Sequence, residues 1–215
     1  MMTRLRVLAR RTSRCPLYLS GAVCPELHHQ PGVGFLLTPY IGNRLPERSV
    51  WAADNGCFSR PNDFKLDRYF VWLRARLGQL RGCLFATAPD LVGQAAATLK
   101  RSAPVLPRLR HLGFPAALVA QDGLEKLPIP WETFDAFFVG GSTEWKLSAI
   151  AASLCREARA RGKWVHIGRV NSLRRLRAAK AMGAHSVDGT FVAFAPKRNA
   201  ARVISWVRGE RRRQP

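Results

Sequence analysis

Short apolar runs alternate with helical patterns along most of the chain. The apolar runs predict strands at Leu17–Val23, Gly34–Thr38, Val50–Ala53, Leu84–Ala88, Ala117–Gln121, Ala136–Val139, Trp164–Ile167 and Ser186–Asp188. Most of these runs are dominated by apolar residues instead of alternating with polar ones, which is typical of parallel strands that are buried on both faces. Between them, apolar residues recur three and four positions apart, which predicts amphipathic helices.

The predicted helices have recognisable ends. Their apolar stripes run over residues 66–77, 92–99 and 147–158, and two further helices are expected from Ser172 to Gly183 and from Pro196 to Gly209. Ser142 is expected to cap the helix at 147–158 and Gly162 to end it, since hydroxyl side chains favour the start of a helix and glycine its end. The prolines at 104, 107, 115, 128 and 130 indicate loops.

Strand and helix alternation predicts βα units and one parallel sheet. Eight strands in 215 residues fit a small single-domain (β/α)₈ barrel, and an open doubly wound sheet is the alternative. We expect the barrel to span residues 15–209, between a basic arm at 1–14 and a basic tail at 210–215. No stretch is long and apolar enough for a membrane span, and five sparsely spaced cysteines favour a reducing compartment.

The charge changes the functional picture. Lys and Arg number 35 against 14 Asp and Glu, which gives a formal charge of +21, and 28 of the cations are arginine. Such a field favours a polyanionic partner, and arginine suits phosphate and bases. GC-rich coding is the other explanation for the arginine bias, but it explains less of the shortage of acids.

Acidic and polar residues follow the predicted strands. Asp54-Asn55, Asp90, Gln121-Asp122, Gly140-Gly141 and Asp188 come at strand ends, and His166 lies within one strand. In a parallel barrel these ends share one face, where the active sites of the fold lie. Each aspartate alone is more often a turn former, but four on one rim indicate a pocket. Paired carboxylates suit chemistry at an anomeric carbon.

Six motifs occur in the order and context of the tRNA-guanine transglycosylase superfamily. They are Asp54-Asn55-Gly56-Cys57-Phe58, Ala88-Pro89-Asp90, Val119-Ala120-Gln121-Asp122-Gly123, Val139-Gly140-Gly141, His166-Ile167-Gly168 and Val187-Asp188. Over residues 50–192 the chain resembles this superfamily of (β/α)₈ barrels, and it is most similar to the shorter, phage-encoded DNA-guanine transglycosylases of deazapurine DNA modification.

The resemblance implies a role for each matched residue. Asp188 would be the nucleophile at C1′ and Asp54 the general acid and base. Asp90 would bind the N1 and 2-amino edge of guanine, while Gln121 and the Gly141 N–H would read its carbonyl. Gly140, Asn55 and His166 complete the expected base pocket, although His166 is equally a candidate for a packed strand residue.

The resemblance also implies the partners. The co-substrate would be a 7-deazaguanine base such as 7-cyano-7-deazaguanine, with no other cofactor, and the polymer would be DNA, with tRNA as the alternative. Sequence differences favour DNA: the superfamily's Cys-x-Cys-x-x-Cys…His zinc site is missing, so no zinc is expected. Gly189-Thr190 also replaces its Pro-Thr-Arg after Asp188. The setting would be a bacterial host cytoplasm; a homodimer or partner protein stays open.

Other interpretations compete with these. Cys15, Cys24, His28 and His29 lack a common zinc spacing, and Cys57 could be a nucleophile but is more simply a small buried residue. Three arginines are expected near the barrel mouth: Arg169, Arg174 and Arg175. They either contact phosphate or belong to a solvated helix face. Two further functions remain open: a hydrolytic glycosylase, and a basic barrel that binds nucleic acid without catalysis.

Overall fold

A computed structural model describes residues 15–40, 42, 44–58 and 63–212, and it confirms the predicted barrel. The strands are β1 (Leu17–Ser20), β2 (Val33–Leu37), β3 (Trp51–Ala53), β4 (Cys83–Thr87), β5 (Ala116–Ala120), β6 (Ala136–Val139), β7 (Trp164–Ile167) and β8 (Ser186–Gly189). The expected arm at residues 1–14 lies outside the described part of the chain.

The strands close in sequence order. Each strand pairs in parallel with the next, and β8 pairs with β1 in the register Leu17↔Ser186 to Ser20↔Gly189. Closure excludes the open doubly wound sheet. The order also means that the carboxyl ends of all eight strands lie on one face of the barrel, as the fold requires.

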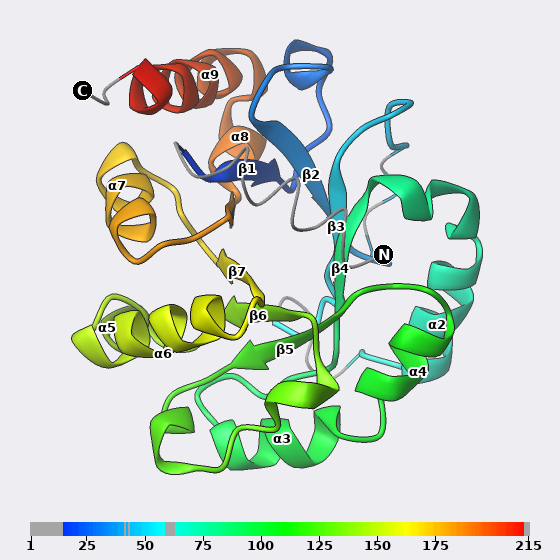
Figure 1. Cartoon of the computed structure of the whole chain (residues 1–215). Helices are drawn as coiled ribbons and strands as arrows, with labels where there is room; N and C mark the ends of the chain where they lie inside the picture. Colours follow the sequence, from blue (N-terminus) through cyan, green and yellow to red (C-terminus); the bar gives the residue numbers. More distant parts are fainter. Residues whose placement is uncertain (1–14, 41, 43, 59–62, 213–215) are drawn as a thin grey trace.

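Helices surround the strands. They are α2 (Leu66–Arg74), α3 (Ala95–Ser102), α4 (Leu106–His111), α5 (Thr143–Lys146), α6 (Ala149–Ala160), α7 (Leu173–Ala181), α8 (Phe191–Phe194) and α9 (Pro196–Arg212). Short 3₁₀ turns occupy Pro25–Leu27 (η1), Leu77–Gly82, Leu124–Lys126 and Trp131–Thr133. Figure 1 shows the strands at the centre with the longer helices around them.

Two apolar clusters stabilise the barrel. Inside the ring of strands, Leu19, Phe85, Val119, Phe138 and Trp164 belong to one cluster, in which the Phe85 and Phe138 rings meet edge to face. A larger cluster fills the space between the strands and the helices. The alternation of side chains along each strand divides them between these two clusters.

The helix predicted at 147–158 is two helices. Ser142 caps the four-residue α5 through its side chain, and Ser148 caps α6. Leu147 and Ile150 are therefore exposed rather than buried, and the buried face of α6 begins at Ala151. Two serines six positions apart each offered a helix start, and the apolar stripe alone did not distinguish them.

Other helix boundaries also differ from the sequence prediction. Helix α4 was missed because Pro107 was taken as a loop residue, whereas it lies in the first turn, where its missing N–H costs nothing. Helix α3 begins at Ala95, so Val92 precedes it and is exposed. The predicted start of α9 at Pro196 and cap of α7 at Ser172 are confirmed, but α9 continues past Gly209 to Arg212.

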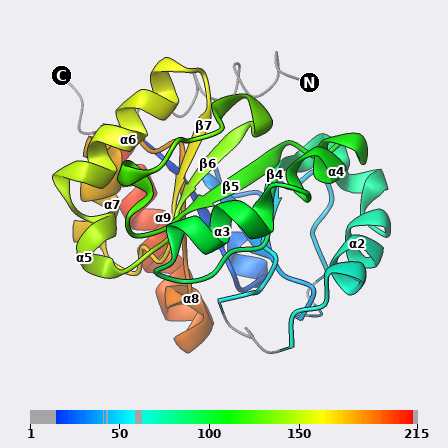
Figure 2. The ribbon, with the colours of Figure 1, turned by 90° about the horizontal axis from the view of Figure 1, so that it is seen from below.

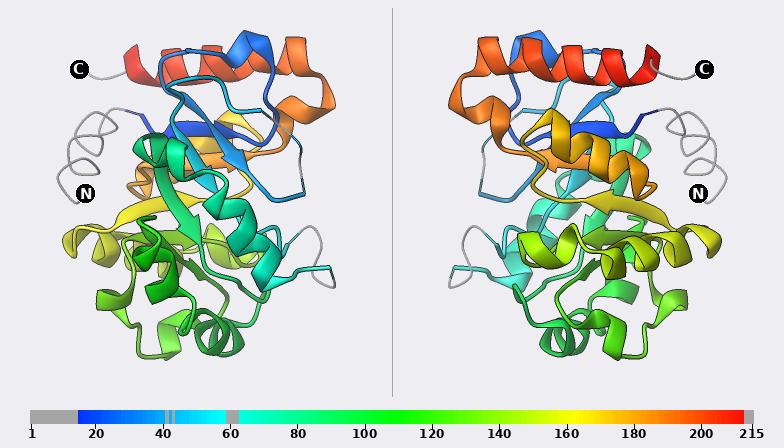
Figure 3. Two further views of the ribbon diagram at one scale, coloured as in Figure 1. Left: turned by 90° about the vertical axis from the view of Figure 1, so that its right-hand side faces the viewer. Right: turned by 90° about the vertical axis from the view of Figure 1, so that its left-hand side faces the viewer.

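Helix α9 continues past Gly209 because side chains of α7 hydrogen-bond to its final turn. Glu210 is buried and accepts hydrogen bonds from Arg177 at 2.8 Å and from the Lys180 ammonium, both on α7. Helix α9 also contacts η1 and β1, and Figure 3 shows α9 (red) beside η1 (blue). No helix in the described ranges is long and apolar enough to cross a bilayer.

The interior cluster makes a testable contribution to stability. Phe85→Ala removes a fully buried ring that contacts Phe138 and His166, so it should lower the free energy of unfolding by about 3–5 kcal/mol. Urea unfolding measures the change. Val71→Ala, at a residue 63% exposed on α2, is the control and should change it by less than about 0.5 kcal/mol. Equal effects would contradict the assignment of Phe85 to the interior.

Candidate functional site

The four rim aspartates lie on one face of the barrel. Asp54 follows β3, Asp90 follows β4, Asp122 follows β5, and Asp188 is the third residue of β8. The short helices α5 and α8 follow β6 and β8 on this same face, at the lower side of Figure 2. The parallel strands therefore bring together carboxylates that are far apart in the sequence.

Thr87 links the first two aspartate loops. Its hydroxyl accepts from the Asn55 backbone N–H at 2.8 Å and from Asn55 Nδ2 at 2.9 Å, and it donates to Asp54 Oδ1 at 3.4 Å. The same Asp54 oxygen accepts from the Gly56 N–H at 3.1 Å. Because a hydroxyl has one proton, these contacts use Thr87 fully and fix one oxygen of Asp54.

Asp90 is held by two side-chain amides. Asn55 Nδ2 donates to its Oδ1 at 3.2 Å, and Gln121 Nε2 donates to its Oδ2 at 2.8 Å. Gln121 Oε1 in turn accepts from the N–H groups of Gly93 and Gly141, at 2.9 and 3.0 Å. These three buried side chains connect the loops after β3, β4, β5 and β6. In this state the Gly141 N–H donates to Gln121, so reading a purine carbonyl would require it to change partner.

The turn at Gly140 and Gly141 has no room for side chains. A Cβ on Gly140 would lie 2.9 Å from Gln121 Nε2, and one on Gly141, where φ is 69°, would lie 2.5 Å from Asp122 Oδ2. Both oxygens of Asp122 bind Ser142, one its N–H at 2.8 Å and the other its hydroxyl at 2.5 Å. Asp122 therefore anchors this turn.

Asp188 is supported from below by a histidine. His166 Nε2 lies 3.0 Å from Asp188 Oδ1, and its Nδ1 lies 2.8 Å from the Ser186 hydroxyl, which also accepts from Trp164 Nε1. Because a carboxylate can only accept, His166 donates its Nε2–H to Asp188, while its Nδ1 shares a hydrogen bond with the Ser186 hydroxyl. His166 is fully buried, and the Asp188 side chain is 14% exposed. His166 thus contacts Asp188 and is not exposed to solvent.

Burial changes the acidity of two carboxyl groups in the site. Burial, and after it the charges of Asp90 and Asp188, raise the pKa of Asp54 to about 7. Burial also raises the pKa of Asp90, although the hydrogen bond from Asn55 opposes the shift. An acid with a pKa near 7 can both give and take a proton at neutral pH, which is the requirement for general acid and base catalysis.

Arginines border the site on the side of β7. Arg169 donates from its guanidinium to the Gly141 carbonyl, and this guanidinium lies 4.8 Å from the centre of the exposed Phe58 ring. Arg175 donates to the Arg169 carbonyl at 3.2 Å. Arg174 is exposed at the start of α7, so only two of the three predicted arginines join the network.

The other candidate chemistries find less support. Burial raises the pKa of the Cys57 thiol to about 12, which disfavours a thiolate nucleophile. Within the described ranges, no three His, Cys, Asp or Glu residues lie close enough to hold a metal ion. All five cysteines are buried thiols that form no disulfide.

Three residues of the site were missed by sequence reasoning. Thr87 and Ser186 were treated as ordinary strand residues, although each lies within three positions of a predicted site aspartate. Lys146 was not singled out at all, yet it is buried on the same face. Only the first two carried a usable signal, because an inward-facing hydroxyl on a buried strand needs a hydrogen-bond partner.

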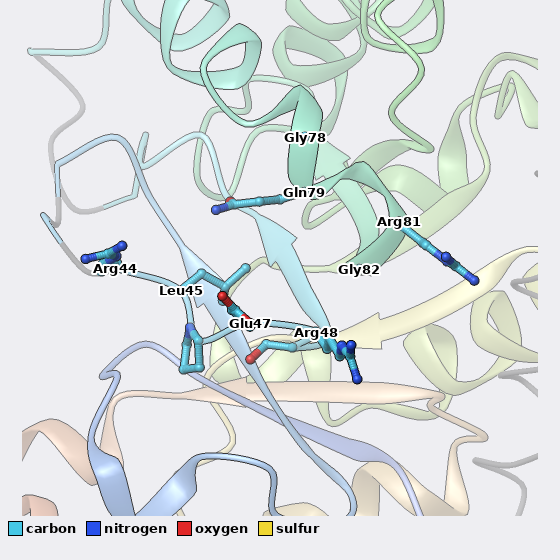
Figure 4. A pocket seen from close by; sticks show the side chains of 10 residues that line it. Arg44, Leu45, Glu47, Arg48, Gly78, Gln79, Arg81 and Gly82 are labelled. Atoms are coloured by element: carbon cyan, nitrogen blue, oxygen red, sulfur yellow. The ribbon is translucent and has the colours of Figure 1, made fainter.

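A large cavity lies elsewhere. It has a volume of about 810 Å³ and precedes β3 and β4, at the amino ends of the strands and opposite the aspartates. Figure 4 shows Arg44, Arg48 and Arg81 around it, together with Glu47. Because it lacks the polar network described above, cavity size alone does not locate the candidate site.

A scan against protein-family models and a search of the curated proteins found no match to this chain. The barrel fold is therefore shown by the structure alone, and membership of the transglycosylase superfamily stays a prediction.

The raised pKa of Asp54 predicts a pH-dependent stability. The folded protein keeps this proton above pH 4 while the unfolded chain, with a pKa of 3.8, has lost it. The stabilisation is therefore fully present below about pH 4 and is lost progressively as the pH rises to about 7, by about 4 kcal/mol in total. Asp54→Asn keeps the acceptor oxygen and should remove this loss.

Urea unfolding between pH 4 and 8 measures this loss as the difference in the free energy of unfolding between wild type and Asp54→Asn. Asp67→Asn, at an exposed aspartate on α2, should run parallel to the wild type. A difference between wild type and Asp54→Asn that does not vary with pH would show that Asp54 has an ordinary pKa.

Proposed function

We propose that this protein exchanges guanine in DNA for a 7-deazaguanine base through a covalent glycosyl-aspartate intermediate. The observation that carries the proposal is a pair of carboxyl groups at the barrel mouth with different surroundings. Asp188 is oriented by a hydrogen bond from His166, and Asp54 has a pKa of about 7. The pair couples a nucleophile to a proton carrier, and the motifs described above assign these same two residues to those roles.

Asp188 supplies the nucleophile. One carboxylate oxygen accepts from His166, which leaves the other oxygen without a described hydrogen bond and able to attack C1′ of the target nucleotide. The C1′–N9 bond breaks as the new C1′–O bond forms, and its electron pair leaves with the guanine. The hydrogen bond from the buried His166 orients the carboxylate for this attack.

Asp54 balances the protons. In its acid form it protonates the departing guanine. It then takes the N9 proton of the incoming base, whose nitrogen attacks C1′ and releases Asp188. The next cycle therefore starts from the same protonation state. The two carboxylates divide nucleophilic and acid–base work as in retaining glycosidases.

Asp90 provides the base recognition. Its two oxygens are fixed by Asn55 and Gln121, and each oxygen has a further lone pair to offer. The N1–H and 2-amino groups of guanine are adjacent donors on one edge, which a fixed carboxylate accepts. A 7-deazaguanine keeps this edge, so the same pocket accepts both the leaving and the incoming base.

The charge supports a nucleic-acid substrate. A +21 chain has a field that favours phosphate, and Arg169 and Arg175 lie beside the site. The target nucleotide must leave its stack to bring C1′ to Asp188, because the carboxylate is largely buried in the barrel mouth.

A base-exchange assay tests the proposal. Radiolabelled guanine is incubated with the protein and with duplex DNA, single-stranded DNA or tRNA, so the identity of the natural deazapurine is not needed. Label should enter DNA, and Asp188→Asn, which keeps the acceptor for His166, should lower the rate by at least about a thousand-fold. Salt-sensitive DNA binding of the variant should persist, because the phosphate contacts remain.

Asp67→Asn is the matched control and should exchange at the wild-type rate. Label in tRNA alone would move the protein to the RNA branch. Abasic sites without added base would indicate a hydrolytic glycosylase. Exchange that survives Asp188→Asn would overturn the nucleophile, and binding with no exchange in any polymer would favour a non-catalytic barrel.

A further inference from the structure

Lys146 is a buried cation without a partner. It is the last residue of α5, which follows the glycine turn after β6, and it is 3% exposed. Its Nζ makes no hydrogen bond in the described part of the chain. Burial of an ammonium group without an acceptor costs free energy, so a folded protein rarely keeps one without a use for it.

The neighbouring charges do not satisfy Lys146. Those that act on it most are Arg169, Asp188, Arg175 and Asp122. Both oxygens of Asp122 already bind Ser142, and Asp188 Oδ1 accepts from His166. Three cations are thus collected beside the candidate nucleophile while the nearby carboxylates serve other groups.

The cationic cluster is held in place by the backbone. Arg169 donates to the Gly141 carbonyl of the turn before α5, and Arg175 donates to the Arg169 carbonyl. Arg169 itself has a left-handed backbone, with φ of 60°. Such a conformation is costly for a residue other than glycine, and it tends to occur where a binding site requires it.

The electrostatic surroundings of Lys146 favour an anion beside it. Burial first, and then the charge of Arg169, lower the pKa of Lys146 to about 8. The ammonium is therefore still mostly charged at pH 7. An anion in the cluster would offset both effects and stabilise the charged form.

We propose that Lys146, Arg169 and Arg175 form a subsite for the phosphate that flanks the target nucleotide. This inference rests on the proposed function for the identity of its ligand. When Asp188 reaches C1′, the adjacent phosphate lies within one sugar of this carboxylate. Two anions at that separation repel each other, and three cations beside Asp188 offset the repulsion.

The cluster has an order of approach. Arg169 and Arg175 are half-buried, whereas Lys146 is enclosed. A phosphate that enters from the barrel mouth therefore meets the two guanidinium groups first. The flexible four-carbon stem of Lys146 then allows its ammonium to reach the phosphate once these groups have turned toward it.

The test compares three small ligands on the full chain by titration calorimetry: deoxyguanosine, its 5′-monophosphate and its 3′-monophosphate. One of the monophosphates should bind the wild-type protein more tightly than the nucleoside. In Lys146→Met this gain should fall by about ten-fold, while nucleoside binding is unchanged, because a charge-assisted hydrogen bond to the phosphate has been removed.

Lys163→Met is the control, since Lys163 is also partly buried but precedes β7 at the opposite end of the barrel. It should keep the full phosphate gain. Lys146→Met should fold at least as stably as the wild type, because it replaces a buried unpaired charge with an apolar chain of similar size. Lys146→Gln gives a second, polar replacement that should also lose the gain.

Two results would overturn the subsite: no phosphate gain in the wild type, or an undiminished gain in both Lys146 variants. The base-exchange assay is read separately. A Lys146-dependent gain without exchange would leave the phosphate subsite standing and remove the proposed reaction. Base exchange that depends on Asp188, together with no tighter binding of either monophosphate, would support the proposed reaction and remove the phosphate subsite.

Discussion

Closure of the parallel barrel is the constraint on which the rest of the structure depends. Once β8 pairs with β1, the carboxyl ends of eight strands must share one face, and residues from loops that never meet in sequence become neighbours. Polar side chains at the strand ends cannot lie deep inside the ring of strands, since Phe85, Phe138 and Trp164 fill it. The polar side chains that end these strands can only gather at the mouth, where water and a ligand reach them.

Buried polar side chains are stable when their hydrogen bonds are satisfied, and those around Asp54 and Asp90 satisfy one another. Thr87, Asn55 and Gln121 use their donors and acceptors to hold two aspartates and four loops. The side chains are therefore oriented before any ligand arrives, so little conformational entropy is lost in ordering them on binding. Asp54 and Asp188 differ because one is desolvated beside other carboxylates, while the other accepts a hydrogen bond from a buried histidine.

The charges of the protein are sorted by position. Carboxylates line the barrel mouth, and cations from the loops after β6 and β7 lie beside them, with Lys146 enclosed and Arg169 and Arg175 nearer the solvent. A substrate that combines a neutral base with phosphates fits this division, because the base enters the acidic pocket and the phosphates remain among the cations. The net charge of +21 would add a long-range attraction for such a polymer.

The sequence by itself determined the fold class. Uninterrupted apolar runs such as Ala136–Val139 and helical stripes between them can bury their faces only in a layered βα arrangement, and eight repeats are enough to close it. It also identified the aspartates at the rim, because strand ends are readable from local pattern. Helix starts were less certain where two capping serines, Ser142 and Ser148, stood close together.

Only the tertiary structure decided how these residues act on one another. It made Asp122 a turn anchor rather than a pocket acid, and placed His166 beneath Asp188 rather than in the open site. It also raised the pKa of Asp54 and enclosed Lys146 where no described residue accepts a hydrogen bond from its Nζ. None of these follows from local pattern, since desolvation and hydrogen bonding depend on side chains that other strands bring within a few ångströms.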